Sequence, residues 1–211
     1  MRPVVLPLSL FGVAITASAL SYPGGSYRAR GSAGYSFWHN FWCDLLSTRA
    51  LNGDDNLLGS VLSRLAFVAF ALALAHFWPR AAALSGPSGA SKLAHRLGLF
   101  GAAALLVVAV VPAATSQLVH GLAVVVSAGC SIAGVMLLIR SLVRRGEAGA
   151  AALGGAVALT TLVCLAQYVY QGFTNDEATW LAGMQKITTA FLLAFMVQLT
   201  ARHRTRASEP Q

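Results

Sequence analysis

The stretch LLGSVLSRLAFVAFALALAHFWP occupies residues 57–79 and contains a single residue that is charged at neutral pH, Arg64. A helix of about 20 mostly apolar residues is long enough to cross the hydrocarbon core of a bilayer. Residues 57–79 are therefore predicted to form a membrane-spanning helix, and the rest of the chain is interpreted around it.

The composition of the whole chain agrees with a membrane domain. Of its 211 residues, 56% are apolar and 10% are charged, and the mean hydropathy is +0.66. Soluble domains have about 25% charged residues and disordered chains are polar, so both classes are excluded. We predict one all-α, polytopic membrane domain over residues 1–211 with six transmembrane helices, the other five being 4–22, 93–114, 117–139, 148–171 and 180–201.

The distribution of basic residues predicts the orientation of this domain. The formal net charge is +8. With six spans, ten basic residues lie on the side of both termini, in the N-terminus, segments 80–96 and 140–147 and the tail 202–211, and three (Arg28, Arg30 and Arg49) lie on the other. Lys and Arg concentrate in cytoplasmic loops. We therefore predict an integral protein of the plasma or inner membrane with both termini cytoplasmic, and interpret the charge as a topology signal without a nucleic-acid partner.

The first predicted span also has features of a signal peptide. Arg2 precedes an apolar core, and the tripeptide Ala17-Ser18-Ala19 has the small-residue pattern of a cleavage site. A retained span gives six helices, whereas cleavage would leave five with unchanged sidedness. The six-span topology assumes that the first span is retained.

The longest segment between spans is residues 23–56, which we call the outer loop. Phe37, Trp38, Phe41, Trp42, Leu45 and Leu46 recur in it at helical spacing, which predicts an amphipathic helix at the membrane interface. This helix is either a structural lid anchored by its aromatic residues or a lid that contributes His39 and Asp44 to a site. Residues 52–56 lack the spacing of a calcium loop, so Asn56 is predicted to cap the helix that follows.

Two cations fall inside predicted spans. Arg64 and Lys186 each lie roughly 10 Å along their helix from its outer end. Charges at such depth usually face a polar interior with a partner, although long basic side chains also reach the headgroups from this position. Both interpretations stay open.

Polar side chains gather in the outer half of the chain. We predict an outward-facing polar pocket that binds lipid or another amphiphile, because two cations can hold a phosphate while acids and histidines supply countercharge. The alternative is that the weakly polar residues are helix-packing positions. The predicted pocket residues are His39, Asp44, Arg64, His120, Gln167, Gln185 and Lys186, with Gln171, Asp176 and Glu177 in the same half.

No motif in the sequence predicts a catalytic residue, so whether the protein is an enzyme stays open. His39, Asp44 and His120 could meet as zinc ligands, but no HxxxH or HExxH pair supports them. We expect no cofactor, with zinc as the weaker alternative. The alternatives to lipid binding are a membrane-embedded, zinc-dependent lipid hydrolase or transferase and a structural partner of another membrane protein.

The layout and one segment are similar to a known group of membrane proteins. The outer loop starts with Pro23-Gly24 and ends in Asn40-Phe41-Trp42-Cys43-Asp44-Leu45-Leu46, and a late span begins with Gln185-Lys186. In these features the chain resembles the FGF-receptor-activating-protein, DRAM and Sfk-like group and the related bacterial six-helix domain of unknown function. The resemblance implies a six-span fold and a role in lipid handling or membrane organisation, and it transfers no catalytic residue.

A second resemblance is to the ceramidase-like membrane hydrolases, which combine Ser, Asp and three histidines around zinc. This chain departs from them because it has no HxxxH pair and too few spans. The resemblance supports the zinc hydrolase only as an alternative.

Overall fold

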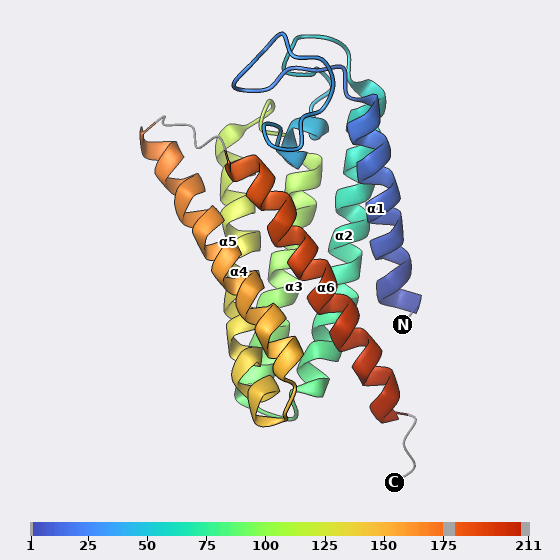
Figure 1. The fold of residues 1–211 in the computed structure, drawn as a ribbon, viewed down its shortest axis with the longest axis vertical. Coiled ribbons are helices and arrows are strands. Elements are labelled where there is room, and N and C mark those ends of the chain that lie inside the picture. Colours follow the sequence, from blue (N-terminus) through green and yellow to red (C-terminus); the bar gives the residue numbers. More distant parts are fainter. Residues whose placement is uncertain (1, 175–179, 208–211) are drawn as a thin grey trace.

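All six predicted spans are helices in the computed structural model, which describes residues 2–174 and 180–207. Each helix is long and apolar enough to cross a membrane. The described part contains no strand beyond two isolated bridges in the outer loop. The helices are α1 (Arg2–Ser21), α2 (Leu57–Leu84), α3 (Gly89–Val110), α4 (Gln117–Arg144), α5 (Ala148–Thr174) and α6 (Leu181–Ala207), with a short 3₁₀ helix η1 (Trp42–Leu46) (Figure 1).

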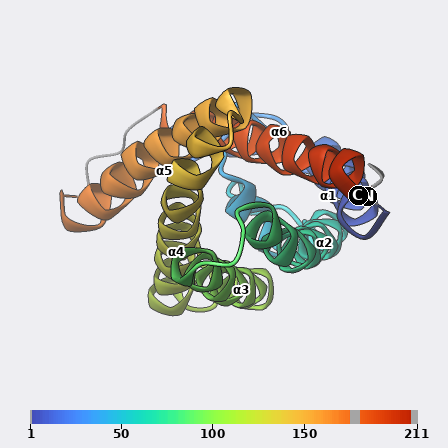
Figure 2. The ribbon, with the colours of Figure 1, turned by 90° about the horizontal axis from the view of Figure 1, so that it is seen from below.

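Each helix packs on the next one in the sequence, and α6 returns to contact α2 and α1. Viewed along the bundle, the helices follow a curved path rather than a compact square (Figure 2). The outer loop and the α3–α4 connection lie at one end, which we call the loop end. The α2–α3 and α4–α5 connections and the two termini lie at the other, the terminus end (Figure 1).

The apolar core is centred on α2. Trp78 is completely buried and its indole fills the space left by two glycines, Gly98 on α3 and Gly134 on α4. Small residues at helix contacts let membrane helices approach closely. Nearby, the rings of Phe77 and Phe195 meet edge to face with centroids 5.8 Å apart, which joins α6 to the same core.

Four helices extend beyond their predicted C-terminal ends: α2, α4, α5 (to Thr174 rather than 171) and α6 (to Ala207 rather than 201). The predicted span 57–79 continues past Pro79 to Leu84, and the predicted span 117–139 continues to Arg144. Hydropathy falls where polar and charged residues begin, whereas backbone hydrogen bonding continues past that point. In α2 the guanidinium of Arg80 donates to the carbonyl of His76. Both α2 and α4 therefore reach further toward the terminus end than their apolar segments do.

The predicted amphipathic helix in the outer loop forms only in its last part. Residues 37–39 form a turn, and only Trp42–Leu46 are helical, as one short 3₁₀ helix. The Asn40 amide explains the interruption, because its Oδ1 accepts a hydrogen bond from the backbone N–H of Ser36 and stabilises a turn there. Leu45 and Leu46 are buried, while Phe37 and Trp38 are about half exposed at 49% and 52%.

Asn56 occupies the N-cap position of α2 as predicted, but its side chain does not cap the helix. Its Nδ2 instead donates to the carbonyls of Leu45 and Ser47, at 3.2 and 2.8 Å. The side chain thus fastens η1 to the start of α2. Ser60 and Ser63 on the first turns of α2 add hydrogen bonds to Leu46 and Leu45.

Candidate functional site

Asn40 is the centre of the polar contacts at the loop end. It is completely buried, and its Nδ2 donates to the carbonyl of Gly25 at 2.8 Å and to Oδ2 of Asp44 at 3.3 Å. Its Oδ1 accepts from the N–H of Ser36 at 2.9 Å. One amide therefore joins three separate parts of the outer loop.

Asp44 is a buried carboxyl beside this amide, with 8% of its surface exposed. Its Oδ2 also accepts from the N–H of Phe41 at 2.8 Å, which caps the first turn of η1. Burial raises the pKa of Asp44 from 3.8 to about 6, and the hydrogen bonds from Asn40 and Phe41 and the charge of Lys186 oppose that rise. Asp44 is therefore an acid that titrates close to neutral pH.

Lys186 extends from α6 into the same cluster and is 5% exposed. Its ammonium donates to the carbonyl of Asn40 at 2.5 Å and to that of Ala182 at 2.9 Å. It also lies 5.2 Å from the ring centroids of both Tyr35 and Phe37, within the range of a cation–π contact. The cation is thus held by two carbonyls and two aromatic rings.

Two further contacts fix the outer loop on α6. Oε1 of Gln185 accepts a hydrogen bond from the backbone N–H of Trp42 at 3.1 Å. Two residues earlier on α6, the indole of Trp38 packs directly on Gly183, where a larger residue would collide with it. The structure therefore brings together Asp44, Gln185 and Lys186; we call them, with Asn40, the outer cluster.

Arg64 and His120 belong to a different place, the C-terminal end of α3. Arg64 donates to the carbonyls of Val110 and Leu46, both at 3.4 Å, and to Oγ of Ser60 at 3.3 Å. Nδ1 of His120 lies 2.8 Å from the carbonyl of Val111. A helix C-terminus has free carbonyls and a partial negative charge, which basic groups stabilise.

The buried Lys186 and the half-buried Arg64 therefore do not converge on one acceptor. Lys186 bonds to Asn40 and Ala182, whereas Arg64 bonds to groups at the ends of α3 and η1. This arrangement differs from the predicted pair of cations on a single phosphate. The physical reason is that each cation donates to the backbone carbonyls nearest to it, which lie on different elements.

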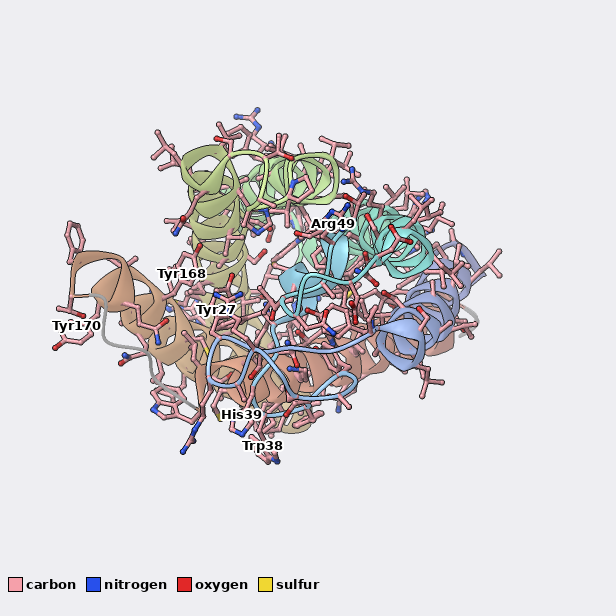
Figure 3. The ribbon with its side chains drawn as sticks, turned by 90° about the horizontal axis from the view of Figure 1, so that it is seen from above. Tyr27, Trp38, His39, Arg49, Tyr168 and Tyr170 are labelled. Carbon is pink, nitrogen blue, oxygen red and sulfur yellow. The ribbon has the colours of Figure 1, made fainter. Side chains whose placement is uncertain are left out.

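The remaining predicted residues are more peripheral. His39 is half-buried and lies beside Trp38 at the edge of the loop end (Figure 3). Neither the side chain of His39 nor that of Gln167 makes a hydrogen bond within residues 2–174 and 180–207. Asp176 and Glu177 lie outside the described residues.

The predicted zinc set of His39, Asp44 and His120 is not assembled. No group of three or more His, Cys, Asp or Glu side chains in the described part of the chain is placed to hold a metal ion. His120 instead uses Nδ1 at the end of α3, and Asp44 uses Oδ2 within the loop. The three residues of this alternative lie on the outer side in the sequence, but that does not fix which helix end each side chain reaches.

Sequence reasoning missed the central role of Asn40 and of Tyr35. The hydroxyl of Tyr35 donates to the carbonyl of Asn40 at 3.1 Å, so this carbonyl accepts two hydrogen bonds. The signal in the sequence was an Asn within an aromatic run, because Asn side chains stabilise turns.

Burial also raises the pKa of Cys43 to about 12, so that thiol is protonated at neutral pH.

No family model matches the chain, and neither a curated protein nor a solved structure is similar to it. The resemblance to the FGF-receptor-activating-protein, DRAM and Sfk-like group stays a prediction from Asn40–Leu46 and Gln185-Lys186.

Proposed function

We propose that this integral membrane protein binds a lipid or another amphiphile at its loop end, with the polar headgroup at the outer cluster. The observation that carries the proposal is that an acid and a base, Asp44 and Lys186, are both buried there. Their charges interact, yet no direct ion pair joins them among the described residues.

A loop that is only structural does not need such a cluster. Removing a carboxylate and an ammonium from water costs several kcal/mol each, whereas apolar contacts such as Trp38 on Gly183 hold the loop without that cost. Ionisable groups at membrane depth are commonly parts of ligand or ion sites. The expense of burying both groups therefore supports a binding role.

The chemistry of the cluster indicates the kind of headgroup. Both hydrogen bonds of Asp44 are made by Oδ2, so Oδ1 is left to accept from a ligand or, when protonated, to donate to one. Lys186 supplies a cation next to it. A headgroup with a hydroxyl or amine and an anionic oxygen would complement both. We assign Asp44, Gln185 and Lys186 to this site, and Arg64 and His120 to the support of α3.

The test is lipid retention by the purified protein. Lipids that co-purify in mild detergent are extracted and quantified for wild type, Asp44→Asn and Lys186→Met. The matched controls are Asp54→Asn, an exposed acid in the same loop, and Lys92→Met, an exposed lysine at the terminus end. We expect a severalfold loss in the two cluster variants and none in the controls.

Unchanged lipid content in the Asp44→Asn, Lys186→Met double variant would overturn the proposal. A membrane protein that co-purifies stoichiometrically in place of lipid would favour the structural-partner alternative, and conversion of an added lipid would favour the hydrolase or transferase.

We also propose that both termini face the cytoplasm, at a plasma or inner membrane. The excess of Lys and Arg at the terminus end supports this orientation. A reporter enzyme that is active only in the cytoplasm, fused after Gln211, tests it. An inactive reporter on a correctly inserted protein contradicts the orientation.

A further inference from the structure

A cavity of about 380 Å³ lies at the terminus end, opposite the outer cluster. Its walls come from the α2–α3 connection, the start of α3 and the last two turns of α4. The polar residues that line it are three arginines and three serines: Arg140, Arg144, Arg145, Ser85, Ser88 and Ser141.

The walls of this cavity are held together by specific contacts. Oγ of Ser141 on α4 donates to the carbonyl of Ser85 at 2.8 Å, across 56 residues of sequence. The guanidinium of Arg145 lies directly against Gly86, which has a φ of +83° and where any side chain would meet that guanidinium. The α2–α3 connection therefore contacts the C-terminal end of α4 at two adjacent residues, Ser85 and Gly86.

The charge around the cavity is entirely positive. None of the lining residues is acidic. Within the described part of the chain, Arg140, Arg144 and Arg145 make no ion pair or hydrogen bond through their side chains. Glu147, the acid nearest to them in sequence, is buried and does not line the cavity. Three guanidinium groups thus line the cavity, and among the described residues no carboxylate is paired with them.

The start of α3 adds to this potential. Ser88 is its N-cap, with Oγ accepting from the N–H of Ser91 at 3.1 Å, and Ala90 in the first turn lines the cavity. A helix N-terminus carries a partial positive charge and free N–H groups that attract anions. Guanidinium groups, hydroxyls and a helix N-terminus are the groups that bind phosphate in proteins.

Membrane topology alone does not account for this arrangement. Arg80, Lys92 and Arg96 provide positive charge at the same end without lining the cavity. Arg140 and Arg144, by contrast, are four residues apart on α4, a spacing at which like charges repel. An anion between them would relieve that repulsion.

We propose that this cavity binds a phosphate-bearing anion at the membrane surface, through Arg140, Arg144 and Arg145. The shared chemistry is a phosphate group, which either an anionic phospholipid or free phosphate supplies. The site is independent of the outer cluster, because it lies at the opposite end of the bundle.

The first arm of the test measures phospholipid. Protein is reconstituted in phosphatidylcholine nanodiscs with and without phosphatidylglycerol and extracted into detergent, and the retained phosphatidylglycerol is counted by native mass spectrometry. The triple variant Arg140→Gln, Arg144→Gln, Arg145→Gln is compared with Arg80→Gln, Lys92→Gln, Arg96→Gln, which removes the same charge at the same end. We expect retention to fall by more than about tenfold in the first triple variant only, because bidentate guanidinium–phosphate contacts are lost.

The second arm uses inorganic phosphate and phosphatidylcholine nanodiscs, with binding measured by calorimetry. Phosphate binding that the cavity variant loses identifies free phosphate as the ligand, whereas phosphatidylglycerol retention without phosphate binding identifies the lipid. If the triple variant does not fold, Arg144→Gln is compared with Arg96→Gln and the same difference is expected. Equal losses in cavity and control variants, or no binding of either probe, overturn the proposal.

Discussion

The ammonium of Lys186 donates a 2.5 Å hydrogen bond to the backbone carbonyl of Asn40, and so joins α6 to the outer loop across 146 residues of sequence. The Asn40 side chain in turn holds Gly25, Ser36 and Asp44. Together with Gln185 and Gly183, this buried lysine holds the outer loop on α6.

Replacing Lys186 by Met is expected to loosen the loop on α6, because the hydrogen bond to the Asn40 carbonyl is lost. The thiol of Cys43, whose pKa burial raises to about 12, would then return toward its ordinary value of 9.0 and become accessible. Since the thiolate is the reactive form, labelling of Cys43 by a maleimide at pH 8 should accelerate by more than about tenfold. The measurement is made with Cys130→Ala and Cys164→Ala in the background. Labelling as slow as in a Lys92→Met control would contradict the fastening role of Lys186.

Asp44 predicts a pH dependence of stability. Burial raises its pKa from 3.8 to about 6, so between these values the folded protein binds more protons than the unfolded chain. The free energy of unfolding therefore falls as pH rises from about 4 to about 6, by at most roughly 3 kcal/mol. Thermal unfolding in detergent over this range should show the decline in wild type and a flatter curve in Asp44→Asn.

Above pH 6, Asp44→Asn tests whether the buried charge of Asp44 lowers the free energy of unfolding. Asn at position 44 keeps an acceptor for Phe41 and removes the buried charge, so Asp44→Asn should be at least as stable as wild type. If Asp44→Asn is more stable than wild type but binds less lipid, Asp44 serves function at the expense of stability, as functional residues commonly do. A pH profile that Asp54→Asn alters as strongly would show that Asp44 is not the titrating group.

The six helices could be predicted from hydropathy because a bilayer demands about 20 apolar residues per helix. The ends of α2 and α4 could not, since Ala81–Leu84 and Arg140–Arg144 remain helical through backbone bonds beyond the apolar segment. In the outer loop, apolar spacing predicted a longer helix than η1. There the side-chain bonds of Asn40 and Asp44 overrode the periodicity.

The candidate site was partly predictable, because the position of a residue along a membrane-spanning helix can be counted from the sequence. The depth of Arg64 and Lys186 along their helices could be counted from the sequence, and both are polar contacts at the loop end. The carbonyl that each of these two cations contacts depends on the positions of α3 and the outer loop. Hydrophobic periodicity does not predict those positions. Asn40 was overlooked because its importance comes from burial, which a loop sequence does not reveal.

Arg64 and His120 are expected to support α3 rather than to bind lipid. Arg64→Met and His120→Phe each remove donors from the carbonyls at the end of α3, and should each lower the free energy of unfolding by about 1–3 kcal/mol. Thermal unfolding measures the loss, and lipid content should stay unchanged. Arg28→Met, an exposed arginine in the outer loop, is the control. Lipid loss in Arg64→Met at unchanged stability would return Arg64 to the binding site.

The packing of Trp78 predicts which helix glycines are indispensable. A Cβ at Gly98 would collide with the buried indole of Trp78, whereas a Cβ at Gly155 on α5 meets nothing within 4 Å. Because overpacking a core costs about 1–3 kcal/mol, Gly98→Ala should lower the unfolding temperature clearly. Gly155→Ala removes backbone freedom at no steric cost and should leave the unfolding temperature unchanged or raise it.

If thermal unfolding in detergent finds both variants equally stable, α3 does not pack on Trp78 as closely as the structure has it. A weakened Gly98→Ala that still retains phosphatidylglycerol would further show that the arginine-lined cavity tolerates strain in the α2–α3 contact.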